Sequence, residues 1–173
     1  KYKPLIISFQ EQGRKNEILA MAEQWNIAHA SIDAKGAVNL RAITELTNIL
    51  KQSEVSILVG HGYKANVIGR LSSWRVGIPM VAVSRGWTTE NWKIWLYQLI
   101  DKLFLRFASH IVAVSEGQKS KIVRLAIPGE KVSVIHNAIN MGSTPLASEF
   151  TIRDELGLPG DAILICTAGR LSP

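Results

Sequence analysis

The sequence predicts an α/β fold in which a parallel sheet is covered by helices on both faces. Short runs rich in valine and isoleucine recur along the chain, as expected for strands that are buried on both sides. Segments whose apolar residues follow helical spacing lie between these runs. Strand and helix therefore alternate, and this alternation favours parallel strands joined by right-handed crossovers.

Seven apolar runs are the expected strands, and the second of them is the weakest. They are Leu5–Phe9, Ala28–Ile32, Val55–Val59, Val81–Ser84, Ile111–Val114, Val132–Ile135 and Ile163–Thr167. The clearest helix is predicted over residues 92–107, where eight apolar residues recur at intervals of three and four and form one broad face. We expect that face to belong to the core. A second helix is predicted to open at Ser115, whose hydroxyl caps the first turn while Gln118 reciprocates in a capping box.

The pattern is interrupted at residues 142–148, which are predicted to form a linker. After it come Thr151 as a helix cap, a short helix that ends near Gly157, and one apolar run. A single strand makes no sheet, so we expect residues 1–142 to form one domain and residues 143–173 to begin a second. The chain opens on Lys1 rather than methionine and ends shortly after an apolar run, which predicts an excised fragment of a longer protein.

Composition excludes several classes of protein. With 47% hydrophobic and 20% charged residues in 173, the chain is neither a disordered tail nor a coiled coil. Its single cysteine, Cys166, excludes a disulfide framework and a cysteine-built zinc site. No apolar stretch approaches the roughly 20 residues of a membrane-spanning helix. The net charge of +6 is regional, because residues 61–131 hold 11 basic and 4 acidic groups, a balance of +7.

Polar residues follow the expected strands directly, at positions that share one edge of a parallel sheet. Ligands of such sheets bind outside the carboxyl ends of the strands. The groups are His61-Gly62-Tyr63-Lys64, Ser84-Arg85-Gly86-Trp87, Ser115-Glu116, His136-Asn137 and, after the last run, Gly169-Arg170. The first four groups predict a polar cleft of positive bias that suits an anionic or hydroxyl-rich ligand. Trp87 and Tyr63 supply flat apolar surfaces for a sugar or a base.

Simpler interpretations compete with a functional one at several of these positions. Gly62 and Gly86 also suit tight turns between strand and helix. Ser115 is better explained as a helix cap than as a nucleophile, because no general base lies at a diagnostic spacing. His29 and His110 are interpreted as structural. The sequence contains no Gly-x-Gly-x-x-Gly, Walker-type or Gly-x-Ser-x-Gly motif and no Asp-x-Asp pair, so metal dependence is disfavoured.

Eight ordered segments between His61 and Pro173 carry a resemblance to a known family, and the resemblance covers most of the chain, from about residue 5 to the end. They are His61-Gly62-Tyr63-Lys64 with Gly69, Gly86-Trp87-Thr88, Leu96-Tyr97, Leu99-Ile100-Asp101, Val112-Ala113-Val114-Ser115-Glu116, Ile127-Pro128, Ile135-His136-Asn137-Ala138-Ile139 and Gly169-Arg170-Leu171-Ser172-Pro173. In their order and spacing the chain resembles the family 4 (group 1) glycosyltransferases. The resemblance implies the GT-B architecture, in which two Rossmann-like domains face each other, and the transfer of a sugar from a nucleotide-sugar donor with retention of configuration. It implies no essential metal and no other cofactor.

The resemblance also implies roles for individual residues. His61, Gly62, Lys64, Gly86 and Trp87 would lie on the acceptor side. Ser115, Glu116 and Asn137 would border the cleft between the domains, and Arg170 would bind the donor diphosphate.

Two departures from the family pattern matter. Arg85 stands where many members carry a histidine near the donor sugar, so it is the candidate catalytic residue, although a guanidinium cannot serve as a base or a neutral acceptor. The family's first strand and glycine-rich loop would lie before Lys1.

The sequence therefore predicts the N-terminal, acceptor-side part of a retaining glycosyltransferase, inactive as an isolated fragment. Its partners would be a nucleotide-sugar donor and a cell-envelope, lipid or polysaccharide acceptor, with peripheral contact to the inner face of the membrane from the cytoplasm. The alternative is a non-catalytic Rossmann-like module whose basic surface binds anionic lipid or another anion. Nucleic acid is disfavoured because the basic residues are interleaved with core positions.

Overall fold

The computed structural model describes residues 2–10, 16–34, 39–87, 92–138, 152–159 and 161–165. The chain divides into two compact units, Lys1–Asn137 and Ala138–Pro173. Unit 1 contains β1 (Leu5–Gln10), α1 (Glu17–Gln24), β2 (Ala28–Asp33), α2 (Leu40–Gln52), β3 (Leu58–His61), α3 (Tyr63–Val76), β4 (Met80–Ser84), α4 (Trp92–Leu105), β5 (His110–Ala113), α5 (Glu116–Val123), a 3-10 turn (Gly129–Lys131) and β6 (Val132–Val134). Within the described part of unit 2 the helix is α6 (Ile152–Leu156).

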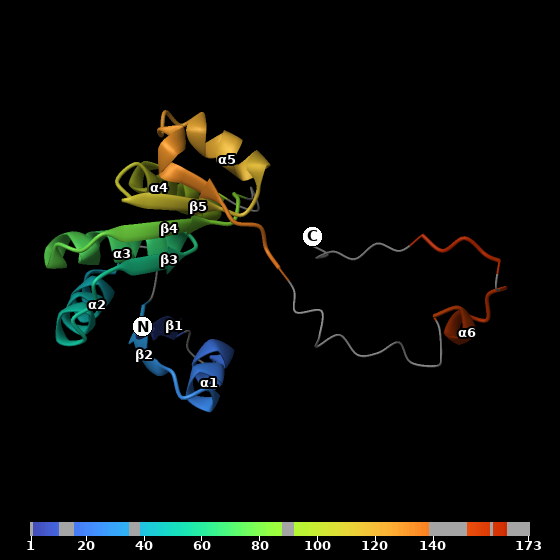
Figure 1. Ribbon diagram of the computed structural model, residues 1–173, viewed down its shortest axis with the longest axis horizontal. Helices are drawn as coiled ribbons and strands as arrows, with labels where there is room; N and C mark the ends of the chain where they lie inside the picture. Colours follow the sequence, from blue (N-terminus) through green and yellow to red (C-terminus); the bar gives the residue numbers. More distant parts are fainter. Residues whose placement is uncertain are drawn as a thin grey trace. The chain divides into compact units, whose positions relative to one another are not determined.

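All described strands pair in parallel, as predicted (Figure 1). β1 pairs with β2, and β3, β4, β5 and β6 form a second sheet in that order. Strands and helices alternate throughout unit 1. The predicted fold class, an α/β protein with a parallel sheet and packed helices, is therefore confirmed. Over the described residues no ladder joins β1 to β3, so the strands fall into two groups.

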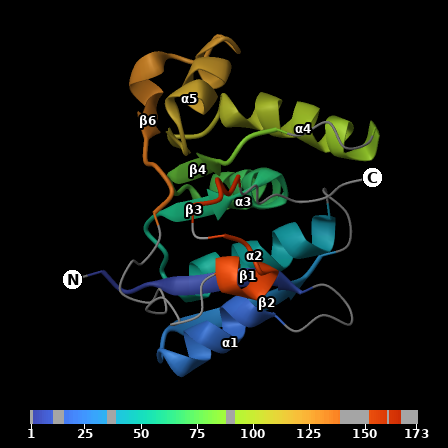
Figure 2. The ribbon, with the colours of Figure 1, turned by 90° about the vertical axis from the view of Figure 1, so that its right-hand side faces the viewer.

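The two-stranded sheet has a helix on each face (Figure 2). On one face, Asn16 caps α1 and its Nδ2 donates to the Ser8 hydroxyl of β1 over 2.9 Å. On the other face, Ile7 of β1 packs against the cluster that contains Ile43 of α2. Because side chains alternate along a strand, Ser8 and Ile7 point to opposite sides, and α1 and α2 are separated by the sheet.

The two sheets share one hydrophobic cluster through α2 and α3. Ile32 of β2, Leu46 of α2 and Ile68 of α3 are fully or almost fully buried in it, and Leu58 of β3 packs against it. α3 also approaches the four-stranded sheet closely at Gly69, where an added Cβ would lie 3.0 Å from the Met80 Cε and 3.1 Å from the Leu58 Cδ2. The glycine lets the helix sit directly over β3 and β4.

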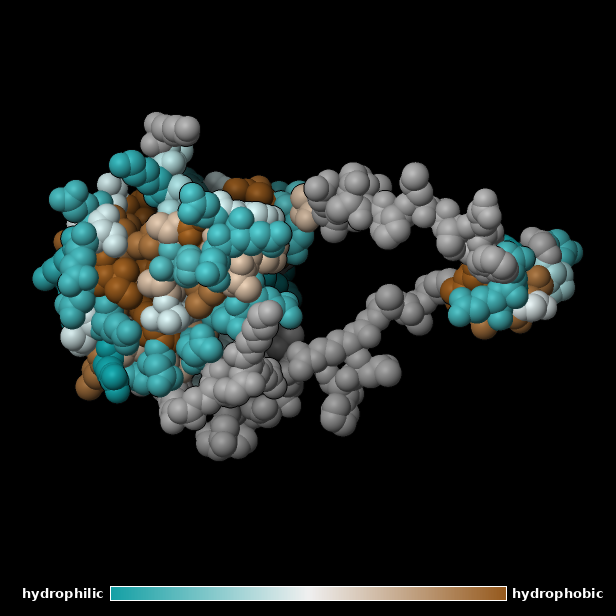
Figure 3. Space-filling model, turned by 90° about the horizontal axis from the view of Figure 1, so that it is seen from below, coloured by the Kyte–Doolittle hydropathy of each residue, from teal (hydrophilic) through white to brown (hydrophobic). Residues whose placement is uncertain are grey.

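A second cluster of buried side chains packs against β4, β5 and β6 of the four-stranded sheet. It joins the buried side chains of three strands to α4, α5 and the loops that follow them: Ala82, Leu105, Ala108, Ile111, Ala113, Ile122, Ile127 and Val132. Such packing stabilises parallel strands, which are buried by their crossover helices. Not every apolar residue is buried, and one side of unit 1 shows apolar residues among hydrophilic ones (Figure 3).

One strand begins later than predicted. β3 starts at Leu58, whereas the apolar run starts at Val55. Glu54 has a positive φ of 49°. The Val55 backbone amide donates to the Leu50 carbonyl over 3.0 Å, and the Glu54 backbone amide donates to the Lys51 carbonyl over 3.2 Å. These are the bonds of a Schellman motif, whose apolar residue folds back on the helix. Val55 therefore closes α2 rather than opening β3.

Two other sequence predictions are wrong. The core face predicted for residues 92–107 is largely at the surface, since Trp95, Leu96, Leu99, Leu103 and Phe107 are exposed while Leu105 is buried. The helix turns its Gln98 and Asp101 side inward instead.

The strand predicted at Ile163–Thr167 is not formed over residues 162–165, and Ile163 and Ile165 are 90% and 93% exposed. An apolar run forms a stable strand only where another strand pairs with it. Residues 166 and 167, the predicted linker at 142–148 and the cap Thr151 lie outside the described residues.

Candidate functional site

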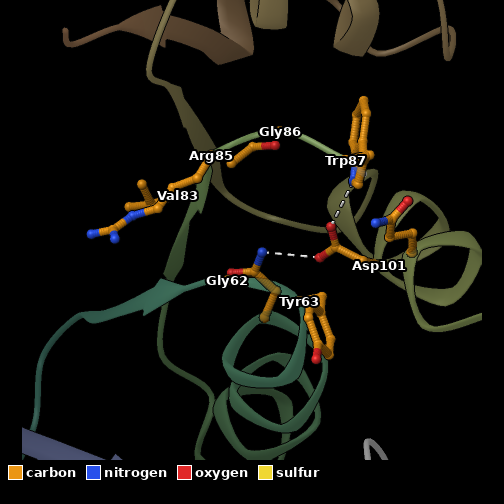
Figure 4. A pocket seen from close by; sticks show the side chains of 10 residues that line it. Gly62, Tyr63, Val83, Arg85, Gly86, Trp87 and Asp101 are labelled. Carbon is orange, nitrogen blue, oxygen red and sulfur yellow. Dashed lines mark hydrogen bonds between the residues drawn. The ribbon is translucent and has the colours of Figure 1, made fainter. Parts of the chain in front are cut away.

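A pocket of about 170 Å³ opens beyond the carboxyl ends of β3 and β4 (Figure 4). Residues from the β3–α3 turn, from the segment after β4 and from α4 line it: Gly62, Tyr63, Asn66, Val83, Ser84, Arg85, Gly86, Trp87, Gln98 and Asp101. This is the position in which parallel α/β sheets bind their ligands. The predicted site residues Gly62, Arg85, Gly86 and Trp87 therefore line one pocket, although the exposed Arg85 side chain extends away from Trp87 and Asp101 (Figure 4).

Two glycines shape the turns that carry these residues. Gly62 has φ 87° and ψ 165° at the start of α3, a combination that is essentially restricted to glycine. Gly86 has φ 116° directly after Arg85. The sharp turns end β3 and β4 and bring the following side chains to the pocket (Figure 4). Gly62 and Gly86 thus serve the turns and line the pocket, so the two interpretations of these glycines are compatible.

Asp101 is the buried centre of the pocket. Its side chain is 3% exposed, its Oδ1 accepts a hydrogen bond from the Asn66 Nδ2 at 3.0 Å, and its Oδ2 accepts one from the Trp87 Nε1 at 3.1 Å (Figure 4). Burial raises the pKa of the Asp101 carboxyl, against the lowering effect of these two bonds and of Lys102. The Lys102 Nζ lies 4.9 Å from the centroid of the Trp87 ring. These contacts fix the orientation of the Trp87 indole.

Tyr63 forms a second aromatic element at the pocket. Its ring stacks on that of Tyr97 with centroids 5.8 Å apart and planes 12° from parallel. Tyr63 opens α3, and Tyr97 belongs to α4, so the stack links the two helices beside the pocket. Together with Trp87 it provides rigid, flat surfaces, which suit contact with the apolar faces of sugars or bases.

His61 and Arg85 are electrostatically coupled. Burial, and secondarily the positive charge of Arg85, lowers the pKa of the His61 imidazole below its ordinary value of 6.5. The imidazole is therefore neutral at pH 7, and one ring nitrogen is able to accept a hydrogen bond. Of these two residues, His61 is the one that can act as a base.

Neutralising Arg85 tests this coupling. We expect Arg85→Met to raise the pKa of His61 toward 6.5 without reaching it, because burial is the larger cause and persists. The measurement is the chemical shift of the His61 ring protons against pH by NMR. Arg124→Met, which removes an exposed charge from the end of α5, is the matched control and should leave the His61 titration unchanged. An unchanged pKa in Arg85→Met would show that the two groups are not coupled.

Lys64 is directed elsewhere. Its Nζ donates to the backbone carbonyl of Ala34 and lies 5.1 Å from the centroid of the Phe9 ring. These contacts connect α3 to the two-stranded sheet, and Lys64 is not among the residues that line the pocket. Its acceptor-side role stays a prediction.

Ser115 caps α5 as predicted, because its hydroxyl oxygen accepts from the Gln118 amide at 3.1 Å. The capping box is wrong in its second half. The Gln118 Nε2 donates to the Ser84 hydroxyl at the end of β4, over 2.8 Å, instead of reaching back to Ser115. The buried Gln118 is drawn inward because it satisfies Ser84, which is also buried.

Glu116 and Asn137 are exposed, and neither lines the pocket. Arg170 and Cys166 lie outside the described residues.

Sequence reasoning missed Asn66, Gln98 and Asp101 as pocket residues. All three are polar side chains within helices, and all three are buried. One signal was available, since Asp101 is the single acidic residue of α4. Asp101 and Asn66 are 35 positions apart, so only the folded chain shows their contact.

The model of one protein family, described as the glycosyl transferase 4-like domain, matches residues 23–138. This is more than half of the chain, and it includes every residue that lines the pocket. The chain belongs to the glycosyl transferase 4-like family. The resemblance noted from the ordered motifs is thereby confirmed.

Among curated relatives of this glycosyl transferase 4-like chain is the Escherichia coli UDP-Gal:alpha-D-GlcNAc-diphosphoundecaprenol alpha-1,3-galactosyltransferase. It is 24% identical over 143 residues, which cover 78% of this chain and 37% of the enzyme. The chain therefore spans less than half the length of this relative.

Solved structures share the fold at low identity. Anabaena Alr3699/HepE in complex with UDP has a TM-score of 0.63 and 13% identity, over 82% of this chain and 46% of that one. Its complex with UDP-glucose has a TM-score of 0.62 and 14% identity over the same shares. The UDP-GlcNAc 2-epimerase of Neisseria meningitidis bound to UDP-GlcNAc has a TM-score of 0.55 and 17% identity, over 75% and 44%. At these identities the structures establish the fold alone.

The described residues contain neither a candidate membrane span nor a candidate metal-binding cluster. Among the described residues, none of the helices combines the length and apolarity that crossing a bilayer requires. The same part of the chain holds no group of three or more His, Cys, Asp or Glu side chains arranged to bind a metal ion.

Proposed function

We propose that this chain is the acceptor-side part of a retaining glycosyltransferase that moves a sugar from a UDP-sugar to a lipid-linked or polysaccharide acceptor of the cell envelope. The observation that carries the proposal is the family match over residues 23–138, which encloses a pocket at the carboxyl ends of β3 and β4. The galactosyltransferase relative acts on a lipid diphosphate, and structures of the same fold bind UDP and UDP-glucose. Both facts support this choice of donor and acceptor.

In this proposal the donor is held by cations. Arg170 binds the diphosphate, and Arg85 holds a phosphate oxygen or a sugar hydroxyl at the pocket, since a guanidinium donates in a fixed fork and carries its charge at every physiological pH. Stabilising the charge that develops on the departing diphosphate is the main catalytic need. Arg85 takes no part in proton transfer, and His61, neutral at pH 7, is the nearby group able to accept a proton or a hydrogen bond.

The acceptor lies against Trp87 and Tyr63 in this proposal. Trp87 presents a ring whose Nε1 is already engaged by Asp101, so its face is positioned before a ligand arrives. Gly62 and Gly86 let the backbone approach closely, and Ser115, Glu116 and Asn137 border the interdomain cleft. A lipid-linked acceptor would place the reaction at the cytoplasmic face of the membrane.

The domain organisation follows from the same proposal. Residues 1–142 form the acceptor-side domain, and residues 143–173 form the linker and the start of the donor-binding domain. The division of the chain after Asn137 supports a boundary in this region. A strand from the preceding part of the protein would join β1 to β3, which are not paired with each other here. The isolated chain would then lack most of the donor site and release no nucleoside diphosphate.

The test uses the natural polypeptide that contains this chain. Release of nucleoside diphosphate is measured from a panel of nucleotide sugars, with and without a lipid-diphosphate-linked N-acetylhexosamine. We expect acceptor-dependent release from a UDP-sugar, its loss in Arg170→Ala and a marked fall in Arg85→Ala. Arg124→Ala is the matched control for the removal of a positive charge and should retain full activity.

Other outcomes separate this function from its alternatives. Conversion of a UDP-sugar to its isomer without acceptor would favour an epimerase, which the epimerase structures of the same fold make a specific alternative. Absence of donor-dependent thermal stabilisation and of release with every sugar would favour a binding module with a basic surface.

A further inference from the structure

α4 carries an exposed apolar stripe along most of its length. Trp95, Leu99 and Leu103 lie at intervals of four and are 52%, 49% and 54% exposed. Residues four apart project from the same side of a helix, and Leu96 and Phe107 widen this stripe, with exposures of 41% and 48%. An apolar stripe of this length on a helix of a globular protein normally faces the core. Here it faces outward.

The stripe continues onto α3 through Trp74. The Trp74 ring lies 5.4 Å from the Phe107 ring, centroid to centroid, in an edge-on arrangement, and 6.1 Å from the Phe104 ring. Trp74 is itself 46% exposed. We call the six exposed residues Trp74, Trp95, Leu96, Leu99, Leu103 and Phe107 the α3–α4 aromatic face. Contiguous exposed patches of this kind mark interaction surfaces.

Positive charges border the α3–α4 aromatic face. The exposed Arg75 follows Trp74 directly, and the partly buried Arg70, whose Nε and Nη1 are buried, has its guanidinium carbon 4.7 Å from the centroid of the Trp74 ring. On α4, Lys102 precedes Leu103 directly. Just after α4, the exposed Arg106 precedes Phe107 directly, and its Nη2 donates to the Leu125 carbonyl. Negative charge is absent from this border over α3 and α4, because their single acidic residue, Asp101, is buried.

We propose that the α3–α4 aromatic face docks on the surface of an anionic lipid bilayer. Tryptophan and phenylalanine with leucine are the side chains that insert at the level of lipid headgroups. Arginine and lysine at the border are attracted to anionic lipids, while their aliphatic stems extend along the apolar surface. A second copy of the chain fits less well, because two such faces would bring like charges together. The proposed function includes contact with a membrane, and this proposal names the surface that makes the contact. It rests on the proposed function in that respect alone.

The experiment measures co-sedimentation of the full natural protein with vesicles, in the absence of nucleotide sugar. Vesicles of phosphatidylglycerol and phosphatidylcholine are compared with vesicles of phosphatidylcholine alone. We expect binding to the anionic vesicles that weakens at high salt, and a roughly tenfold loss in the triple variant Trp95→Gln, Leu99→Gln, Leu103→Gln. The double variant Arg75→Gln, Arg106→Gln should weaken binding to the anionic vesicles and leave binding to phosphatidylcholine vesicles unchanged.

The matched control is Trp25→Gln with Leu40→Gln, since these side chains, just after the end of α1 and at the start of α2, are 63% and 71% exposed. It should bind as the unmodified protein does.

Circular dichroism and thermal unfolding verify that each variant is folded, and the single variant Leu99→Gln replaces the triple variant if that one unfolds. Failure of the unmodified protein to bind anionic vesicles, or unchanged binding in the variants, would overturn the proposal. Light scattering that shows a dimer abolished by the same variants would assign the face to a second copy instead. These measurements involve no sugar transfer. A negative result would therefore overturn the membrane-docking proposal without contradicting the proposed glycosyltransferase function.

Discussion

Replacing Asp101 by alanine is expected to lower the free energy of unfolding by about 2 kcal/mol at pH 7. The substitution leaves two donors without their acceptor, the Nδ2 of the buried Asn66 and the Nε1 of the partly buried Trp87. An unsatisfied buried donor loses its hydration without compensation. The loss also frees the Trp87 ring, so ligand binding at the pocket should weaken together with stability. Chemical denaturation monitored by tryptophan fluorescence measures the first effect.

Asp101→Asn is the matched variant and should cost less than about 1 kcal/mol. The Asn66 Oδ1 is buried and has no hydrogen-bond partner among the described residues. When the Asn66 amide turns over, this oxygen can accept from the new amide at position 101, whose own oxygen still accepts from Trp87. Equal losses in Asp101→Ala and Asp101→Asn would show that the negative charge, rather than hydrogen-bond accepting capacity, is what the pocket requires.

The two variants also differ from the unmodified protein in their dependence on pH. Burial raises the pKa of Asp101 above its ordinary value of 3.8, so the folded state holds this proton more tightly than the unfolded state does. The cost of burying the carboxylate is therefore absent below pH 3.8 and complete above the raised pKa. Stability of the unmodified protein relative to Asp101→Asn should fall as the pH rises through this window. A difference that is constant with pH would contradict the raised pKa.

The sequence predicted well the strands that pair regularly. It predicted poorly the positions at which a helix ends and the next strand begins. β1, β2, β4, β5 and β6 lie at the predicted runs. In all of them except β2, which is mostly exposed, short runs rich in valine and isoleucine fit a parallel sheet. Val55 was misassigned because an apolar residue that closes a Schellman motif looks the same as the first residue of a strand. The α4 face was misassigned for a related reason, since periodicity identifies an apolar face but not what covers it.

The candidate site was predictable in its loops and not in its helices. Gly62, Arg85, Gly86 and Trp87 follow strands, and the carboxyl ends of parallel strands share an edge by geometry, so their meeting in one pocket could be expected. Lys64 follows β3, as Gly62 does. Its side chain nevertheless turns toward Ala34, because successive side chains on a helix are rotated by about 100°. The contacts of Asp101 join distant helices and depend on packing that no local pattern records.

Gly62→Asn is expected to lower the free energy of unfolding by about 1–3 kcal/mol. Gly62 has φ 87° and ψ 165°, a region that side chains other than glycine essentially do not occupy. Asparagine is otherwise a favourable residue at the start of a helix, so a loss here reports backbone conformation rather than a poor cap. No atom lies within 4 Å of a Cβ added at Gly62, which excludes a steric clash as the cause.

Gly77→Asn, at the other end of α3, is the matched control. Gly77 also has open space around an added Cβ and a positive φ of 81°, but its ψ of 25° is in the left-handed helical region that asparagine tolerates. This variant should lose much less stability, and thermal unfolding of both variants under one condition makes the comparison. Equal stability of the two would mean that the β3–α3 turn adopts another conformation without cost.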